Sequence, residues 1–340
     1  MQTMTQQGAH DAPRDEKDVI LEARGLAKHF PVRTFFGRTK QVVKAVDGID
    51  LTIFRGETFG LVGESGCGKS TLGRTLIRMH EPTAGTITFD GEDVSHVRGR
   101  ALVDVHHRMQ IVFQDPYQSL DPHQTVREII REPLSVGGSL SSSEMDERAA
   151  EMLERVGMHA DDLYKFPYEF SGGQRQRIGI ARALSVNPEF ILCDEPISAL
   201  DVSIQAQVVN MLEDLQQELG LTYIFVAHDL SMVRHISDRI GVMYLGNMVE
   251  LAPTQELFDN PKHPYTEALM AAIPTTDIDA DKELRILEGD IPSPVNPPKG
   301  CKFHTRCAHC TEICKHAVPE WVEIAPNHFV ACHHPLEGKE

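Results

Sequence analysis

The sequence predicts an α/β fold in which helices cover a sheet of buried strands. Short apolar runs recur between turn signals and helical patterns, chiefly at residues 57–63 (ETFGLVG), 188–194 (PEFILCD) and 221–228 (LTYIFVAH). Strand signals that alternate with helical patterns are typical of α/β proteins. The 340 residues, 41% hydrophobic and 24% charged, amount to about two domains of ordinary size, and they contain no apolar run long enough to cross a membrane.

The first part of the predicted core covers residues 19–113. Strand-like runs lead to residues 57–63, which end in glycine, and a helical pattern follows over residues 69–80. One face of this expected helix carries three apolar residues: Leu72, Leu76 and Met79.

The middle of the chain is predicted to be mostly helical. Helical patterns fill residues 115–187, and the Gly/Ser-rich loop 137–143 ends in serines that are suited to capping the next helix. Strand signals then return at residues 188–194, 221–228 and 239–246. A helix that packs on the sheet is expected between the first two of these strands, from a stripe made of Val208, Leu212, Leu215 and Leu219.

The composition changes after Leu251 to Pro, His and Cys, and residues 291–300 (IPSPVNPPKG) indicate a stiff, polyproline-like linker. The sequence therefore predicts an α/β core, a helical insertion and a small C-terminal extension. The expected boundaries are 19–113 with 188–250 for the core, 114–187 for the insertion, and 251–340 for the extension.

The chain is strongly acidic. Thirty-three Lys and Arg residues stand against fifty Asp and Glu residues, which gives a formal net charge of −17 with neutral histidines. Such a charge repels phosphate backbones, so nucleic acid is not an expected partner unless one face is locally basic. Residues 1–17 have no apolar segment and carry acids, unlike a secretory signal or an Arg-rich transit peptide, and we expect a cytoplasmic protein.

A phosphate-binding loop is predicted at residues 63–71 (GESGCGKST), which fit the pattern G-x-x-x-x-G-K-[ST] between a strand and a helix. Glycines let backbone N–H groups converge on a polyphosphate, and the start of the helix adds partial positive charge. We expect the Lys69 ammonium to reach the β- and γ-phosphates of the bound polyphosphate and the Ser70 hydroxyl to bind Mg²⁺.

Two consecutive acids lie at the end of the predicted strand 188–194. Asp194 is its last residue, and Glu195 follows directly. Because the carboxyl end of a parallel strand faces the ligand crevice, Asp194 is expected to hold Mg²⁺ through water and Glu195 to act as general base on the attacking water. Two adjacent acids after a strand are often only a solvated strand end. The phosphate-binding loop earlier in the chain favours the functional interpretation.

Residues 171–177 (SGGQRQR) resemble the signature motif of the ABC transporter ATPase family, and the resemblance covers about residues 19–250. It implies a P-loop NTPase core, with a RecA-like parallel sheet and an antiparallel β subdomain, and a helical ABC subdomain. In that family the signature segment meets the nucleotide bound to the opposite subunit. Phe170 stands where the family usually has leucine.

The resemblance also implies roles for single residues. Gln114 matches the Q-loop glutamine, His228 the switch histidine, Asp201 in SALD the D-loop, and Phe30 the aromatic residue that stacks on adenine. The expected catalytic residues are Glu195, His228, Gln114 and Lys69, and those expected at Mg²⁺ are Ser70, Gln114 and Asp194. The residues expected to contact nucleotide are Phe30, Gly63, Glu64, Ser65, Gly66, Cys67, Gly68, Lys69, Ser70, Thr71, Gln114, Asp194, Ser171, Gly172, Gly173, Gln174 and Asp201.

The Q-loop segment, residues 114–122 (QDPYQSLDP), corresponds to the place where transport members of the family contact their membrane subunits. Tyr117 and Leu120 are predicted to form an apolar docking surface, although ordinary loop packing would explain them too. Non-transport members usually carry a long coiled-coil insertion or two fused cassettes. A single phosphate-binding loop and a short insertion disfavour a role on nucleic acid or ribosomes.

The C-terminal part resembles the dipeptide/oligopeptide branch of ABC importers, at residues 260–274 (NPKHPYTEALMAAIP) and 291–307. The resemblance implies a [4Fe–4S] cluster on four cysteines with spacing C-x₅-C-x₆-C-x₁₇-C: Cys301, Cys307, Cys314 and Cys332. Cys310 falls outside this pattern. The spacing alone also permits Zn²⁺, with spare ligands available from His304, His309, His316, His333 and His334.

Together these resemblances imply the ATP-hydrolysing subunit of an importer for di- or oligopeptides, peripheral on the cytoplasmic face of the cell membrane. The implied partners are a second, related ATPase subunit in a heterodimer, two integral membrane permease subunits and, indirectly, an external substrate-binding protein. Nickel chelates and oligosaccharides stay open as substrates, because specificity resides in the permease and the binding protein.

Overall fold

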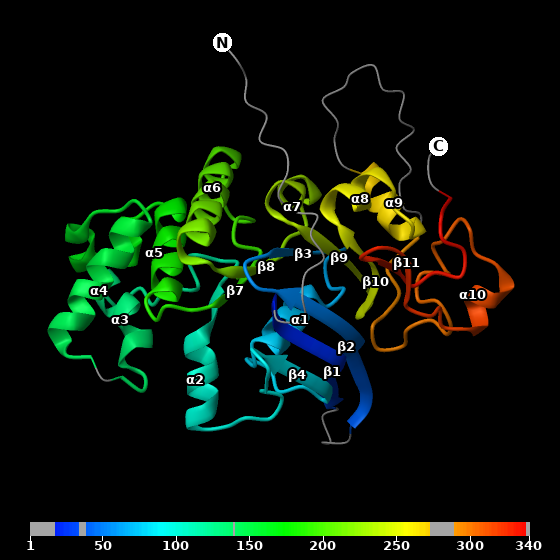
Figure 1. The fold of residues 1–340 in the computed structure, drawn as a ribbon, viewed down its shortest axis with the longest axis horizontal. Helices are drawn as coiled ribbons and strands as arrows, with labels where there is room; N and C mark the ends of the chain where they lie inside the picture. Colours follow the sequence, from blue (N-terminus) through cyan, green and yellow to red (C-terminus); the bar gives the residue numbers. More distant parts are fainter. Residues whose placement is uncertain (1–17, 34–38, 139, 273–288, 338–340) are drawn as a thin grey trace, which may run out of the picture.

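The computed structural model describes residues 18–33, 39–138, 140–272 and 289–337 (Figure 1). Its framework consists of two sheets, one with eight strands in the order β11-β12-β10-β9-β3-β8-β7-β6 and one with four in the order β2-β1-β4-β5. The strands of the larger sheet are β3 (Thr58–Val62), β6 (Met109–Val112), β7 (Phe190–Asp194), β8 (Thr222–Val226), β9 (Arg239–Tyr244), β10 (Asn247–Pro253), β11 (Val322–Ala325) and β12 (His328–Val330). Those of the smaller sheet are β1 (Val19–Arg33), β2 (Thr39–Phe54), β4 (Ala84–Phe89) and β5 (Glu92–Asp93).

The predicted central strands are confirmed. β3 pairs in parallel with β8 and β9, and β7 pairs in parallel with β6 and β8. Every residue of β3, β7 and β8 is buried. Burial on both faces is the reason that these segments are uninterrupted apolar runs rather than alternating patterns.

Helix α1 (Lys69–Leu76) lies between the two sheets and contacts strands of both (Figure 1). Leu72 and Leu76 are buried there, as expected, but Met79 is exposed. The prediction of a helix reaching residue 80 was wrong, because Arg78 adopts a positive φ of 63° that ends the helical path.

The described part of the helical insertion contains two short 3₁₀ helices, Ala160–Tyr164 and Pro167–Glu169, and three α-helices. It lies at the end of the molecule away from the C-terminal extension (Figure 1), and its α-helices are α3 (Val126–Ser135), α4 (Ser142–Arg155) and α5 (Gly172–Leu184). Each begins with a capping box, made by Thr125 and Glu128, by Ser141 and Glu144, and by Ser171 and Gln174. Reciprocal bonds of this kind satisfy the free N–H groups of a first helical turn. The serine cap predicted at the end of loop 137–143 is therefore confirmed.

The helix that was expected to pack on the sheet is α6 (Val202–Leu219). Val208, Leu212 and Leu215 are buried, whereas Leu219 is 40% exposed. Leu219 leaves the stripe because Gly220, in a left-handed conformation, ends the helix directly after it. Helices α2 (Arg100–Arg108) and α7 (Leu230–Ile236) complete this part of the fold.

The C-terminal extension continues the large sheet. Strand β12 pairs antiparallel with β10, and β11 pairs with β12, so the boundary expected at residue 250 falls inside β10. At this junction the buried Glu250 carboxylate lies 2.7 Å from Nε2 of the buried His328 and accepts backbone N–H groups of Lys262 and His263. The remaining elements are α8 (Thr254–Asp259), α9 (Pro264–Ala271) and α10 (Glu312–His316).

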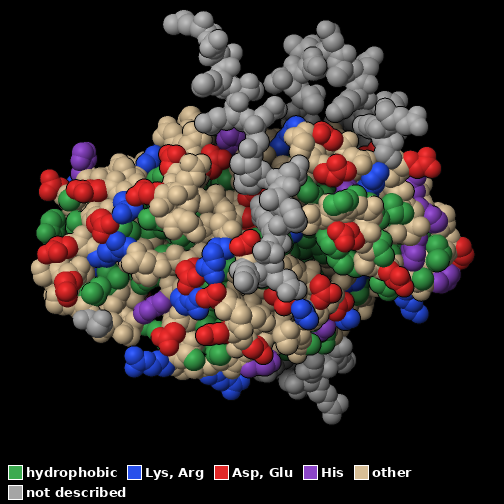
Figure 2. All heavy atoms as spheres, in the orientation of Figure 1, with side chains coloured by type: hydrophobic (Ala, Val, Ile, Leu, Met, Phe, Trp, Pro, Cys, Tyr) green, Lys and Arg blue, Asp and Glu red, His purple; other side chains and the backbone are tan. Residues whose placement is uncertain are grey.

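Surface charge is mixed on the face drawn in Figure 2, where acidic and basic side chains alternate and no broad basic area appears. Histidine side chains gather at the end of the molecule that carries α10. Among the described residues, no helix combines the length and the hydrophobicity needed to span a bilayer.

Candidate functional site

Residues 63–71 form a loop that wraps around the start of α1. Gly63, Gly66 and Gly68 all have positive φ, at 147°, 78° and 109°. A Cβ on Gly68 would lie 2.1 Å from the carbonyl oxygen of Ala45, so this position needs glycine for both its backbone angle and its space. The tight curl directs the N–H groups at the start of α1 toward the space above the loop, as an anion site requires.

A cavity of about 420 Å³ opens over this loop. The Lys69 ammonium is buried, and it donates hydrogen bonds to the carbonyl oxygens of Gly63 at 2.7 Å and Glu64 at 3.2 Å. The cavity brings together the loop, strand residues and the linker: Phe30, Val43, Lys44, Ala45, Ser65, Gly66, Cys67, Gly68, Lys69, Ser70, Thr71, Gln114, Glu195, Leu245, Gly246 and Pro294. Pro294 was not expected here, because a proline-rich linker gives no signal of what it passes.

Asp194, at the end of β7, is fully buried. Its Oδ2 accepts a hydrogen bond from Nε of Arg74 at 3.0 Å and forms an ion pair with Nη2 of the same side chain at 2.9 Å, while its Oδ1 has no partner among the described residues. A buried carboxylate oxygen without a partner is costly unless a cation or water occupies it. This orphaned oxygen suits the Mg²⁺ role expected of Asp194. The pairing with Arg74 was missed, because an arginine on a helix face carries no motif.

Glu195 is the centre of a polar cluster. Nε2 of Gln114 donates to its Oε2 at 2.7 Å, and Nδ1 of His228 lies 3.8 Å from the same oxygen. Glu195 has a positive φ of 50°, which is uncommon for a residue other than glycine and is a form of strain found at functional sites. The structure therefore brings three of the expected catalytic side chains together beside the phosphate loop.

The signature segment lies elsewhere. Ser171, Gly172, Gly173 and Gln174 begin α5, and none of the described residues that line the cavity comes from this segment. Gly173 packs against α6, where a Cβ would lie 2.6 Å from a methyl group of Ile204. Asp201 precedes α6 and its carbonyl accepts N–H groups of that helix. The expected site residues thus divide between two surfaces of one chain.

The Q-loop segment differs from its prediction in one residue. Tyr117 is 58% exposed, with the Arg175 guanidinium 4.1 Å from its ring centroid. Leu120 is only 2% exposed and belongs to a hydrophobic core that the helical insertion shares with the large sheet. The expectation that both residues form a docking surface was therefore wrong for Leu120, because an apolar residue in a turn can point into the core as easily as outward.

The four cysteines of the predicted pattern line one small cavity: Cys301, Cys307, Cys314 and Cys332. Burial raises the pKa of the Cys301 and Cys332 thiols to about 11. Cys310 does not line this cavity, and its thiol faces the Thr311 carbonyl. Histidines 304, 309, 333 and 334 also line it, whereas His316 pairs with Glu312.

The donor chemistry of this cavity fits a metal centre, since four thiolates suit both an iron–sulfur cluster and zinc. Within the part of the chain that the structure describes, however, no three His, Cys, Asp or Glu side chains lie close enough together to form a metal-binding group. The four cysteines thus line a common cavity, but their side chains are farther apart than the ligands of one metal centre.

The comparisons with known proteins match both halves of the chain. Residues 46–198 match the family model described as "ABC transporter", and residues 249–314 match "Oligopeptide/dipeptide transporter, C-terminal region". The chain is 55% identical over 321 residues to the oligopeptide transport ATP-binding protein AppF of Bacillus subtilis (strain 168), covering 93% of this chain and 98% of that protein. It belongs to the ABC transporter ATP-binding proteins.

Other ABC proteins agree with this assignment. A putative peptide import ATP-binding protein of Brucella abortus (strain 2308) is 52% identical over 313 residues, which cover 92% of this chain and 97% of the relative. A dimeric post-hydrolysis structure of the ATP-binding cassette MJ0796, bound to ADP and Pi, superposes with a TM-score of 0.62 at 28% identity. The superposition covers 69% of this chain and 99% of the MJ0796 chain, so this ABC protein contains an ATPase cassette and further residues outside it.

Proposed function

We propose that this ABC protein hydrolyses ATP to drive the import of di- or oligopeptides across the cell membrane, from the cytoplasmic face. The observation that carries the proposal is that the ATPase cassette and the C-terminal region each match their own transporter family model within one chain. The relatives named above are described as peptide or oligopeptide transport proteins, and the chain matches them over nearly their whole length.

In the proposed ATPase reaction, the phosphates of ATP bind the loop 63–71 and adenine stacks on Phe30. Mg²⁺ would be held by Ser70, Gln114 and Asp194, where it neutralises phosphate charge. The Asp194 oxygen without a partner supports this assignment.

Glu195 then accepts a proton from the attacking water, as the general base. Gln114 donates to one oxygen of that carboxylate at 2.7 Å, and this contact fixes its orientation. His228 is 61% exposed at its side chain, which leaves it accessible to the γ-phosphate.

A second ABC subunit completes the proposed site. The signature segment lies on the helical insertion and outside the cavity of its own chain, so in the proposal each chain presents both its phosphate loop and its signature segment to one facing subunit. Two such chains, facing each other, enclose two nucleotides. Following the resemblance to the dipeptide/oligopeptide branch, we propose a heterodimer that docks on two integral membrane subunits, to which an external binding protein delivers the solute.

The docking surface of this proposal centres on Tyr117. Its ring is exposed at the start of the Q-loop segment and is braced by Arg175. Gln114, three residues earlier, contacts Glu195, so a movement of the segment at the membrane would reach the catalytic carboxylate.

Transport is tested by deleting this chain in cells and restoring it in wild-type form or as the Lys69→Ala variant. We expect uptake of labelled di- and oligopeptides to disappear on deletion and to return only with the wild type. Labelled nickel chelates and oligosaccharides are followed in parallel. Normal peptide uptake in the deleted cells, with loss of another solute, would overturn the peptide assignment.

We further propose that Cys301, Cys307, Cys314 and Cys332 bind a [4Fe–4S] cluster, with Zn²⁺ as the alternative. Their common cavity supports the choice of these four and separates them from Cys310. After anaerobic purification, the wild type is expected to contain iron and to absorb broadly near 400 nm.

Cys314→Ser is expected to remove both signals, while Cys310→Ser, the matched control, keeps them. Zinc without iron would select the alternative. A wild-type protein that contains neither metal would exclude a metal centre at these cysteines.

A further inference from the structure

A side chain of the C-terminal extension, Arg306, forms an ion pair with a residue of the phosphate loop. Both Nη atoms of Arg306 bind the Glu64 carboxylate, at 2.7 and 3.0 Å, in a bidentate ion pair. The Arg306 side chain is only 4% exposed. Glu64 directly follows the first glycine of the loop, and Arg306 lies far from it in the sequence. Bidentate pairs of this kind are strong and fix orientation.

The backbone of the same loop residue is held as well. The N–H of Glu64 donates to the Tyr265 hydroxyl at 2.8 Å, and Tyr265 is a buried residue of α9. The Glu64 carbonyl in turn accepts from the Lys69 ammonium at 3.2 Å. One residue therefore connects the phosphate-binding lysine to two side chains that come from the region beyond the cassette.

Charge gives this contact a direct consequence for an anionic ligand. A carboxylate carried by a loop that binds polyphosphate repels the ligand, and a cation paired with that carboxylate reduces the repulsion. The pKa of Arg306 is raised by its hydrogen bonds to Glu64, so its charge is permanent at physiological pH. Without Arg306, Glu64 would carry an uncompensated charge and its side chain would be free to turn toward the phosphates.

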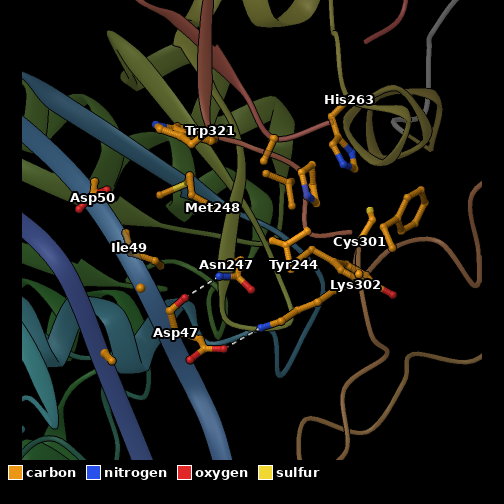
Figure 3. A pocket seen from close by; sticks show the side chains of 18 residues that line it. Asp47, Ile49, Asp50, Tyr244, Asn247, Met248, His263, Cys301, Lys302 and Trp321 are labelled. Atoms are coloured by element: carbon orange, nitrogen blue, oxygen red, sulfur yellow. Dashed lines mark hydrogen bonds and ion pairs between the residues drawn. The ribbon is translucent and has the colours of Figure 1, made fainter. Parts of the chain in front are cut away.

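Arg306 lies in a short segment, residues 301–307, that makes several contacts with the rest of the protein. Arg306 directly precedes Cys307, and the segment begins at Cys301; both cysteines line the small cavity described above. Between them, the Lys302 ammonium binds the Asp47 carboxylate at 3.3 Å (dashed line in Figure 3) and the Leu245 carbonyl oxygen at 3.0 Å. The buried Phe303 ring packs against those of Tyr244 and Tyr265.

We propose that Arg306 is a positioning residue of the phosphate loop, through which the segment 301–307 sets the affinity of the site for ATP. The proposal rests on the proposed function in one respect, namely that the phosphates of ATP bind at residues 63–71. It assigns the C-terminal extension a role in nucleotide binding within its own chain.

The test compares Mg·ATP binding, by titration with a fluorescent ATP analogue, and the melting temperature without nucleotide. Arg306→Gln is expected to weaken ATP binding about fivefold, with Arg306→Lys intermediate because lysine keeps the charge but not the bidentate geometry. The matched control is Arg127→Gln, which removes the bidentate pair with Asp146 in the helical insertion. It is expected to leave ATP affinity unchanged.

A double-mutant cycle isolates the contact itself. In the Glu64→Gln background, Arg306→Gln is expected to change ATP affinity less than twofold, because the charge that it compensates is gone. A merely structural role would lower the melting temperature and leave ATP affinity as in the wild type. That outcome, or an equal loss of affinity in both backgrounds, would overturn the proposal.

The failure of this inference is distinguishable from that of the proposed site. If Lys69→Ala still binds ATP normally, the phosphates do not bind at residues 63–71, and the proposed site is wrong. If Lys69→Ala loses binding while Arg306→Gln matches the wild type, the nucleotide site stands and only the role of Arg306 is refuted.

Discussion

Replacing Glu195 with glutamine is expected to slow ATP hydrolysis at least about a hundredfold, while Mg·ATP binding changes little. General bases contribute on the order of 10²–10⁴ to the rate, and an amide cannot accept the proton of the attacking water. A glutamine at this position keeps the size of the side chain, so the neighbouring Gln114 and His228 retain their surroundings. ATP would then persist between the subunits and hold them together.

Phosphate release, ATP affinity and ATP-dependent association with the partner subunit measure these three effects. Glu213→Gln is the matched control, because Glu213 is a partly buried acid on α6 that faces His235 and lies outside the cavity. It should hydrolyse ATP at the wild-type rate. A rate near wild type in Glu195→Gln itself would refute the role of Glu195 as general base.

Replacing Lys69 with alanine is expected to weaken Mg·ATP binding about a hundredfold, because a charged contact to the phosphates is lost. The ammonium is buried within the loop and held by the carbonyl oxygens of Gly63 and Glu64. Alanine suits the start of α1, so the fold should persist. The loss would therefore be one of binding rather than of structure.

Equilibrium titration with Mg·ATP, together with circular dichroism to check the fold, measures this effect. Lys165→Ala removes a lysine that pairs with Asp162 in the helical insertion, and its affinity should equal that of the wild type. ATP affinity in Lys69→Ala within about twofold of the wild type would contradict the assignment of the phosphate site. A collapsed circular dichroism spectrum would instead contradict the expectation that the fold persists.

The central strands and the cap of α4 could be predicted because their causes are local. β3, β7 and β8 consist mainly of consecutive apolar residues, as strands covered on both faces do, and Ser141 and Glu144 are only three residues apart. The phosphate loop could be predicted as well, because its glycines and Lys69 lie within one short motif and their chemistry depends on the backbone.

Side-chain direction in turns and at helix ends could not be predicted. Leu120 points into the core and Leu219 lies at an exposed helix end, although both are apolar residues in suitable patterns. Hydrophobic periodicity reports which face of an element is buried, but not where the element stops or how a loop turns. The end of α1 at Leu76 was missed for the same reason.

By itself, the sequence determined the α/β class, the phosphate loop and the cysteine spacing, because each is encoded by neighbouring residues and by backbone chemistry. Only the tertiary structure decided that Arg74 pairs with Asp194, that Gln114 meets Glu195, and that Arg306 binds Glu64. These contacts join residues far apart in the chain, and each is an ion pair or polar contact whose partner is chosen by packing. The tertiary structure also shows that the C-terminal extension continues the large sheet and contacts the phosphate loop.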